Sequence, residues 1–226
     1  MLEVNLVKIK FKGKLIELKP TKILAVAKNY VKHINELKLS VPDDPKIFLK
    51  PPSAMIGNNG VVIIPKMSER VDYEVELAAI IKDRCWKVSK EKALDYVLGF
   101  TIFNDVTARD IQAREMKEGM PWDIAKGFDT FAPIGPEVIP AEYVDCHSLN
   151  IWLKLNEEMK QNSNTKNMIF SVEYLISYLS HVMTLEPMDI IATGTPEGVG
   201  PMKEGDFVEC GIEDIGILKF KVESEI

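Results

Sequence analysis

The chain consists mainly of short segments in which apolar and polar residues alternate, with turn-forming residues between them. A period of two residues is typical of strands that bury one face. Segments 2–11 and 14–18, joined at Lys12 and Gly13, predict an N-terminal hairpin. The pattern predicts a mainly β protein of the α+β class, with further strands at 22–28, 47–50, 61–64, 72–82, 99–104, 150–155, 188–193, 206–211 and 216–222.

Helical spacing of apolar residues interrupts the strands in a few places. One helix is expected over 107–118, and another begins at Ser171 and presents a single apolar face. Shorter helices are expected over 90–97 and 30–39. The polar stretch 157–167 is expected to form a hairpin or a long loop, not a linker between domains.

Length and composition predict one folded domain. The 226 residues are 46% hydrophobic and 27% charged, which is the ordinary range of globular proteins. Within that single domain, residues 1–20 are expected to form a short hairpin extension and residues 21–226 the main body. The net charge of −6 and the scattered Lys and Arg residues argue against nucleic-acid binding.

The N-terminal segment lacks the continuous apolar block of a signal peptide, and no later run reaches the roughly 18 apolar residues that span a bilayer. We therefore expect a cytoplasmic protein that does not associate with membranes. Cys85, Cys146 and Cys210 form no CxxC pair, so neither a disulfide framework nor a thiolate zinc site is expected. Reduced, buried thiols are expected instead.

Carboxylates gather in the segment VDYEVELAAII at 71–81. Strand alternation places Asp72, Glu74 and Glu76 on one face, with the last two about 7 Å apart at Cα. A half-buried strand with a solvated acidic face explains the same pattern. The acidic face becomes apolar from Ala78 onward, however, so the patch is expected at the edge of a buried surface.

A further carboxylate, Asp105, follows the apolar run GFTIF and precedes the expected helix over 107–118. It is a candidate helix cap. It is also a candidate third ligand, if it converges with Glu74 and Glu76. Three converging carboxylates repel one another and raise their pKa values unless a cation lies among them. Their all-oxygen donor set suits Mg²⁺, Mn²⁺ or Ca²⁺ and disfavours zinc.

Six segments occur in an order and spacing that resembles the fumarylacetoacetate hydrolase family: AKNYVKHINE (27–36), PKIFLKPPSA (45–54), DYEVELAAII (72–81), NDVTARDIQ (104–112), AKGFDTFAPIGP (125–136) and ATGTPEGVG (192–200). The resemblance spans nearly the whole chain. It implies a mixed β-sandwich roll with a few peripheral helices, in which residues 21–226 form the catalytic domain.

The resemblance also implies roles for individual residues. Glu74, Glu76 and Asp105 match the family's ligands for a divalent cation, Mg²⁺ or Mn²⁺, with Ca²⁺ as a substitute. His33 and Glu36 match a catalytic pair in which the carboxylate orients the imidazole as a general base. Their spacing alone is equally compatible with a surface histidine beside a surface glutamate.

Lys126 matches a catalytic lysine that places a positive charge near the metal and favours an enolate. Composition alone is compatible with an ordinary solvated lysine at this position. The loop 194–200 fits neither of the common nucleotide-binding motifs. The resemblance implies substrate-binding roles for five further residues, Tyr30, Lys50, Arg109, Gln112 and Thr195.

Together these features predict a divalent-metal-dependent enzyme that acts on small 2-oxo or 2,4-dioxo acids through a metal-stabilised enolate, as an acylpyruvate hydrolase or oxaloacetate decarboxylase. One alternative is a 2-hydroxyhepta-2,4-diene-1,7-dioate isomerase or decarboxylase of aromatic catabolism. An alternative of another class is a non-catalytic metal-binding protein. Family isomerases often lack the histidine–glutamate pair, so its presence favours water-dependent cleavage. Family members are usually homodimers, which predicts a homodimer here.

Overall fold

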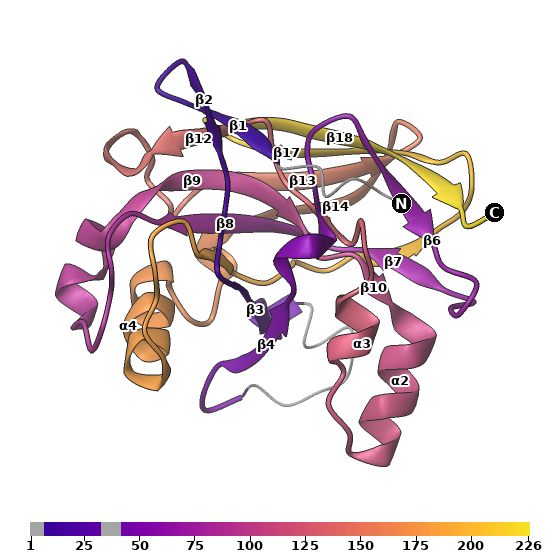
Figure 1. The fold of residues 1–226 in the computed structure, drawn as a ribbon, viewed down its shortest axis with the longest axis horizontal. Helices are drawn as coiled ribbons and strands as arrows, with labels where there is room; N and C mark the ends of the chain where they lie inside the picture. Colours follow the sequence, from indigo (N-terminus) through magenta and orange to yellow (C-terminus); the bar gives the residue numbers. More distant parts are fainter. Residues whose placement is uncertain (1–6, 33–41) are drawn as a thin grey trace.

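The computed structural model describes residues 7–32 and 42–226 (Figure 1). Its largest sheet mixes parallel and antiparallel strand pairs. In spatial order the strands of this sheet are β2 (Lys14–Glu17), β1 (Lys8–Phe11), β12 (Glu137–Pro140), β9 (Val97–Asn104), β8 (Val75–Ile81), β15 (Ile190–Ala192), β3 (Ile23–Ala27) and β4 (Lys46–Lys50).

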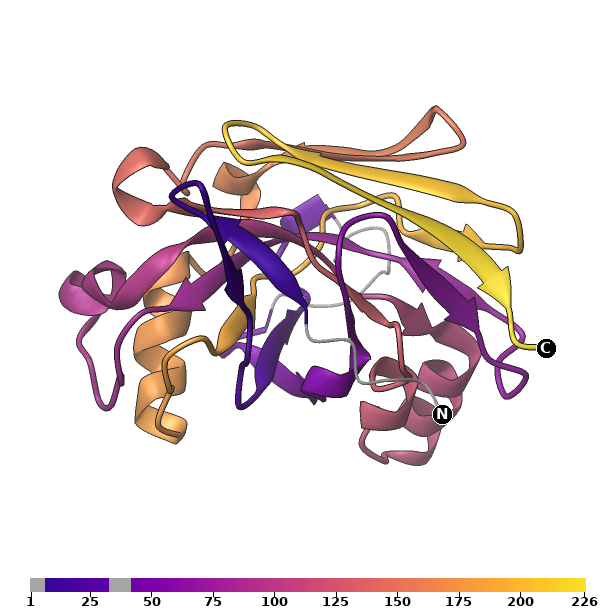
Figure 2. The ribbon, with the colours of Figure 1, turned by 45° about the horizontal axis from the view of Figure 1, so that its top comes forward.

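A second sheet lies across one face of the first (Figure 2). Its strands, in spatial order, are β14 (Glu158–Asn164), β13 (Asn150–Leu155), β17 (Phe207–Ile212), β18 (Gly216–Ser224) and β6 (Gly60–Ile64). Two small sheets complete the fold. One contains β10 (Thr107–Ala108), β7 (Val71–Tyr73) and β16 (Gly200–Met202), and the other contains β11 (Ala132–Pro133) and β5 (Met55–Ile56).

The eight-stranded sheet separates two hydrophobic cores. Leu77 and Ala79, at odd positions of β8, pack into the core that also contains Leu153 of the five-stranded sheet. Ala78 and Ile80, at even positions, pack into the second core. The even face of β8 is the face that carries Glu76, as strand alternation requires. The expected transition from an acidic to a buried apolar face is therefore confirmed.

Helices lie at the periphery of the sheets. α2 (Arg109–Glu118) and α3 (Asp123–Lys126) lie side by side at one end of the molecule, and α4 (Val172–Val182) lies at the other (Figure 1). Within the described ranges, no helix is both long and apolar enough to cross a membrane. The described residues also form short 3₁₀ segments, η1 (Pro52–Ala54), η2 (Lys90–Tyr96), η3 (Ala141–Tyr143) and η4 (Thr165–Asn167).

The mainly β fold with peripheral helices is confirmed, but several element predictions were wrong. The strand expected over 72–82 is divided at Glu74 into β7 and β8. The first two residues of the helix expected over 107–118 form β10, because Thr107 pairs with Asp72. The polar stretch 157–167, in contrast, contains β14, which pairs antiparallel with β13 across a turn at Asn156 and Glu157, so the expected hairpin is confirmed.

The N-terminal hairpin belongs to the large sheet. β1 pairs with β2 across the expected turn and also runs parallel to β12. Ile9 on β1 is buried in the second core together with Ala25 of β3. The large sheet therefore curls, since strands near its opposite edges pack into one core. Most of the helix expected over 30–39 lies outside the described residues.

Candidate metal centre

The three predicted metal ligands lie together where β8 begins and β9 ends. One oxygen from each of Glu74, Glu76 and Asp105 lies within 4.8 Å of the others, and all three residues are buried. Val75, the first residue of β8, pairs with Asn104, the last residue of β9. This antiparallel register places Glu74 opposite Asp105, whose amide donates to the Glu74 carbonyl at 2.8 Å, and Glu76 follows two residues later on β8.

The structure does not use Asp105 as a helix cap. α2 begins at Arg109 after Ala108, and no side chain caps its first turn. Asp105 instead accepts hydrogen bonds from two buried ammonium groups. Lys50 Nζ lies 2.6 Å from its Oδ1, and Lys126 Nζ lies 2.5 Å from its Oδ2. The carboxylate thus belongs to the acidic cluster and not to the helix terminus.

Lys126 links two of the carboxylates. Its Nζ lies 3.2 Å from Glu74 Oε2 in addition to its contact with Asp105, and it donates to Thr107 Oγ1 at 2.7 Å. The ammonium also lies 4.7 Å from the centroid of the Phe48 ring, a favourable cation–π distance. The lysine predicted to be catalytic is therefore buried within the cluster and is not a solvated surface residue.

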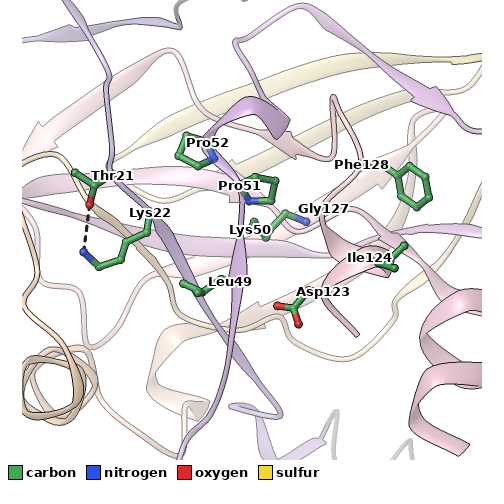
Figure 3. A pocket seen from close by; sticks show the side chains of 10 residues that line it. All are labelled: Thr21, Lys22, Leu49, Lys50, Pro51, Pro52, Asp123, Ile124, Gly127 and Phe128. Carbon is green, nitrogen blue, oxygen red and sulfur yellow. Dashed lines mark hydrogen bonds between the residues drawn. The ribbon is translucent and has the colours of Figure 1, made fainter. Parts of the chain in front are cut away.

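Lys50 pairs with Asp105, and its side chain is fully buried. Its Nζ also donates to the backbone oxygen of Val106 at 3.0 Å. Lys50 does not line the cavity next to the carboxylates, so its substrate-binding role stays a prediction. It lines instead a separate cavity of about 570 Å³ on β4 and α3 (Figure 3), with Thr21, Lys22, Leu49, Pro51, Pro52, Asp123, Ile124, Gly127 and Phe128.

The burial of these charges shifts their protonation equilibria. Burial raises the pKa of Glu76 well above its ordinary value, and the Asp105 and Glu74 carboxylates raise it further. Burial lowers the pKa of Lys126, but the same two carboxylates outweigh burial, so the pKa of this ammonium is raised overall. The site thus keeps a charged lysine and still favours additional positive charge beside Glu76.

Arg109 connects the metal cluster with the remaining carboxylate of the acidic face. Its guanidinium donates to Asp72 Oδ2 at 2.9 Å, to Gln112 Oε1 at 2.6 Å and to Glu74 Oε1. Asp72 also accepts two hydrogen bonds from Arg70, at 2.9 and 3.1 Å. Asp72 is therefore held by two guanidinium groups and does not join the three-carboxylate cluster.

A narrow cavity of about 70 Å³ opens onto the cluster. An adjoining hollow of about 450 Å³ shares Lys28, Phe48 and Trp122 with it. The narrow cavity is lined by Val26, Ala27, Lys28, Phe48, Glu74, Glu76, Asp105, Arg109, Gln112, Met116, Trp122, Lys126 and Thr195.

The loop after β15 contacts the metal cluster through its backbone. The Gly194 amide donates to Glu76 Oε2 at 2.8 Å. The Thr195 hydroxyl donates to the Val75 carbonyl at 2.9 Å and accepts from Gln161 Nε2 at 2.9 Å. Thr195 lines the cavity, but its hydroxyl donates its proton to the Val75 carbonyl, so its substrate-binding role stays a prediction. Gln161 was missed from the sequence because it lies in the polar stretch 157–167.

Asn29 and Tyr30 lie near the end of the first described range, 7–32. Asn29 is buried and joins two segments, accepting from the Phe170 amide at 2.7 Å and donating to the Thr193 carbonyl at 2.7 Å. Tyr30 is fully buried, and its hydroxyl has no hydrogen-bond partner within the described part of the chain. Burial raises the pKa of Tyr30, and the charge of Glu76 adds to the shift. Tyr30 does not line the cavity at the cluster, so its substrate-binding role stays a prediction.

The predicted catalytic pair, His33 and Glu36, lies outside the described residues. Its roles therefore stay predictions from the sequence. The described residues place nine of the eleven predicted site residues, and seven of these line the narrow cavity: Glu74, Glu76, Asp105, Arg109, Gln112, Lys126 and Thr195.

Known proteins are similar to this chain over nearly its whole length. The family model described as fumarylacetoacetate (FAA) hydrolase C-terminal matches residues 22–223. The chain is 43% identical to the mitochondrial oxaloacetate tautomerase FAHD1 of Bos taurus over 201 residues, which is 89% of this chain and 91% of that protein.

Two solved structures are also similar. Fumarylpyruvate hydrolase from Pseudomonas aeruginosa, in complex with Mn²⁺ and pyruvate, superimposes with a TM-score of 0.91 at 32% identity and covers 97% of each chain. The 2-hydroxyhepta-2,4-diene-1,7-dioate isomerase from Mycobacterium marinum has a TM-score of 0.83 at 38% identity and covers 96% of this chain and 83% of that one. Because the family model and these relatives cover nearly the whole chain, the protein belongs to the fumarylacetoacetate hydrolase family.

Proposed function

We propose that this protein is a divalent-metal-dependent enzyme that acts on small 2-oxo or 2,4-dioxo acids through an enolate. The observation that carries the proposal is the buried cluster of Glu74, Glu76 and Asp105, with its oxygens within 4.8 Å of one another. The Mn²⁺ and pyruvate bound to the similar fumarylpyruvate hydrolase support the same type of ligand.

The residues of the cluster fit a divalent cation. All three donors are carboxylate oxygens, which suit Mg²⁺ or Mn²⁺. Burial and the two neighbouring carboxylates raise the pKa of Glu76, so a cation that binds here stabilises its charged form. When bound, the cation would polarise the 2-oxo group and stabilise the negative charge that develops on its oxygen.

Side chains of the protein are proposed to stabilise the negative charge of the enolate together with the cation. Lys126 is buried against Asp105 and Glu74, so it contributes positive charge where an enolate forms. Arg109 and Gln112 line the cavity from α2, which supports the proposal that they orient a substrate carboxylate. His33, oriented by Glu36, is proposed to activate the water that attacks a 2,4-dioxo acid.

In the hydrolytic reaction, water adds to the C4 carbonyl and the C3–C4 bond breaks. The electron pair of that bond passes to the enolate of the 2-oxo acid, which takes up a proton at C3. The products are pyruvate and a carboxylic acid. Decarboxylation of oxaloacetate produces the same enolate with carbon dioxide as the second product, so one site serves both reactions.

A second candidate is the interconversion of the keto and enol forms of oxaloacetate. The 43% identity to the bovine oxaloacetate tautomerase, over 91% of its length, favours this reaction. It uses the same enolate but requires neither water attack nor cleavage of a carbon–carbon bond. The dienedioate isomerase from M. marinum shows that the fold also accommodates isomerisation of a diacid.

Turnover of a panel of acids with Mg²⁺, Mn²⁺ or a chelator separates these candidates. Pyruvate released from acetylpyruvate indicates hydrolysis, and pyruvate released from oxaloacetate indicates decarboxylation. Loss of the enol absorbance of oxaloacetate without pyruvate indicates tautomerisation. Normal metal affinity without any of these activities would support the non-catalytic alternative and overturn the proposal.

The variant His33→Ala tests the proposed base. We expect unchanged Mn²⁺ affinity, because the three ligands remain, and cleavage slowed by about 10²- to 10⁴-fold, the usual contribution of a general base. If the enzyme is a tautomerase, cleavage is absent in both proteins and the variant is compared by the rate of enol loss. Wild-type turnover in His33→Ala for every substrate used would exclude His33 as the base.

A further inference from the structure

The backbone amides of Glu74 and Val75 are held by side chains, although the same stretch also pairs with β9. β7 ends at Tyr73 and β8 begins at Val75, so Glu74 lies at an interruption. The Glu74 amide donates to Asn104 Oδ1 at 3.1 Å, and the Val75 amide donates to Gln161 Oε1 at 3.0 Å. Two side-chain amides thus satisfy the two backbone donors that the interruption leaves without a ladder partner.

Gln161 comes from the other sheet and completes a closed ring of hydrogen bonds. Its Oε1 accepts from the Val75 amide, and its Nε2 donates to Thr195 Oγ1 at 2.9 Å. The Thr195 hydroxyl in turn donates to the Val75 carbonyl. Nε2 also donates to the carbonyl of Pro196 at 2.9 Å. One fully buried side chain therefore connects the strand that carries the ligands to the loop at 194–196.

This network determines the orientation of the Gln161 amide. The Val75 amide can only donate and the Pro196 carbonyl can only accept, so Oε1 must face the first and Nε2 the second. The Thr195 hydroxyl then accepts from Nε2 and its proton points to the Val75 carbonyl. A residue without both a donor and an acceptor cannot close the ring.

The same loop contacts a metal ligand directly. The Gly194 amide, one residue before Thr195, donates to Glu76 Oε2 at 2.8 Å. Gln161 therefore acts on the cluster by two routes. It holds the backbone that joins Glu74 to Glu76, and it anchors the loop whose amide orients the Glu76 carboxylate.

We infer that Gln161 is a positioning residue of the metal site, which sets the geometry of Glu74 and Glu76 without touching the ion. The inference rests on the proposed function, since it presupposes that the cluster binds a divalent cation. Groups that orient metal ligands through hydrogen bonds typically change metal affinity by about 10- to 100-fold when they are removed.

The test measures Mn²⁺ affinity of the purified full-length chain by calorimetry, without substrate. Gln161→Met keeps an unbranched side chain of similar length and removes the donor and the acceptor. Asn164→Ala, on the same strand, is the matched control, because its side chain bonds to Lys166 and Asn150 and not to the metal loop. Melting temperatures of all proteins are measured with a chelator present.

We expect Gln161→Met to bind Mn²⁺ about 10- to 100-fold more weakly than the wild type, and Asn164→Ala to bind it with wild-type affinity. Wild-type affinity in Gln161→Met, at a lowered melting temperature, would show a purely structural role and overturn the inference. A wild type that binds no Mn²⁺ would overturn the metal assignment itself, so the two failures are distinguishable.

Gln161→Glu keeps the inference testable if Gln161→Met does not fold. The carboxylate still accepts from the Val75 amide, but it loses the donor to Thr195 and Pro196. We expect Mn²⁺ affinity between those of the wild type and Gln161→Met when all three fold, and a reduced affinity relative to wild type when only Gln161→Glu folds. Wild-type affinity in Gln161→Glu would show that the anchored loop does not orient Glu76.

Discussion

At the scale of single residues, the site is a balance between buried carboxylates and the cations around them. Asp105 contacts both Lys50 and Lys126, and Glu74 contacts Lys126 and Arg109. Glu76 contacts none of these cations in the described ion pairs and accepts from a backbone amide instead. Glu76 is therefore the ligand that depends most on a bound metal ion.

Replacing Glu76 with Gln tests its assignment as a ligand. The amide retains the size of the side chain and an acceptor for the Gly194 amide, but it removes one negative charge from the donor set. We expect Mn²⁺ affinity to fall at least about tenfold, equivalent to about 1.4 kcal/mol, and turnover to fall with it. Calorimetric titration measures the affinity, with Glu209→Gln, which removes the charge from a partly exposed ion pair with Lys219, as the control. Equal affinities in Glu76→Gln and wild type would disprove the assignment.

Replacing Lys126 with Met tests whether the ammonium stabilises the cluster before metal binds. Removing one partner of a buried ion pair typically costs about 3–5 kcal/mol, because a charge remains buried and unpaired. With a chelator present, we expect the free energy of unfolding in urea to fall by this amount. With Mn²⁺ present we expect a smaller decrease, because the bound cation supplies positive charge in place of the ammonium.

The control for this prediction is Lys219→Met, which removes a partly exposed pair with Glu209. Ion pairs near the surface contribute about 0–1 kcal/mol to the free energy of unfolding, so we expect Lys219→Met to change it little. If Lys126→Met lowers the free energy of unfolding equally with and without Mn²⁺, the lysine does not compensate the carboxylate charges of the metal cluster.

At the scale of elements, the interruption between β7 and β8 separates residues that a continuous strand would place on one face. Glu74 and Glu76 reach the cluster, whereas Asp72 pairs with Arg70 and Arg109. Strand alternation predicted the shared face of the three carboxylates. It did not predict the interruption, because the groups that hold it, Asn104 and Gln161, are 30 and 86 residues away in sequence.

A second connection between elements depends on Asp189, which precedes β15. Its buried carboxylate accepts from the Thr21 amide and hydroxyl, from the Lys22 amide and ammonium, and from the Glu186 amide. Burial opposes the charged form, but these hydrogen bonds, with Lys22 first, outweigh burial and lower the pKa of Asp189. The carboxylate thereby ties the start of β3 to the start of β15.

This connection predicts a pH-dependent contribution to stability. Because the pKa of Asp189 is lower in the folded protein than its ordinary value of 3.8, the contribution is fully present above that value. It is lost as the pH falls through the folded pKa. We expect Asp189→Asn to lower the free energy of unfolding by about 2–3 kcal/mol at pH 7, and the difference from wild type to shrink below about pH 4.

Urea unfolding at a series of pH values checks this prediction. Asp83→Asn is the control, since Asp83 forms only an exposed pair with Lys82 among the described contacts. A difference between Asp189→Asn and wild type that stays constant with pH would assign the effect to packing and not to the charge of Asp189.

At the scale of the whole molecule, the metal cluster lies where the two sheets and the helices at one end meet. Glu76 comes from the large sheet, Gln161 from the five-stranded sheet, and Lys126 from α3. Metal binding is therefore expected to stabilise the fold as a whole, because unfolding separates the ligands and releases the ion. The homodimer and the cytoplasmic location stay predictions, and light scattering of the purified protein checks the first.

Thermal unfolding measures this coupling between metal and fold. At a free Mn²⁺ concentration 100 times the dissociation constant, the stabilisation is about 2.7 kcal/mol. For a chain of this size it raises the melting temperature by about 5–11 °C relative to a chelator. The same addition to Glu76→Gln is the control and is expected to give a smaller rise. An unchanged melting temperature in wild type would contradict metal binding at the buried cluster.

The sequence by itself determined the mainly β class, the apolar and acidic faces of 71–81, and the order of motifs that resembles the family. These properties depend on residues that are close together in the sequence, because strand alternation has a period of two residues and each motif is a short continuous segment. From them came the three carboxylates and the cations Arg109 and Lys126, all of which the structure brings to one cavity.

Only the tertiary structure decided how those residues are held. It showed that Asp105 belongs to the cluster and pairs with Lys50, and that it is not a helix cap. It also showed that Asp72 pairs with two arginines and that Gln161 accepts from the Val75 amide, between Glu74 and Glu76. Each of these contacts except Arg70 with Asp72 joins residues far apart in the chain. Their energies arise from burial and from the pairing of polar groups across sheets, which no local pattern of residues encodes.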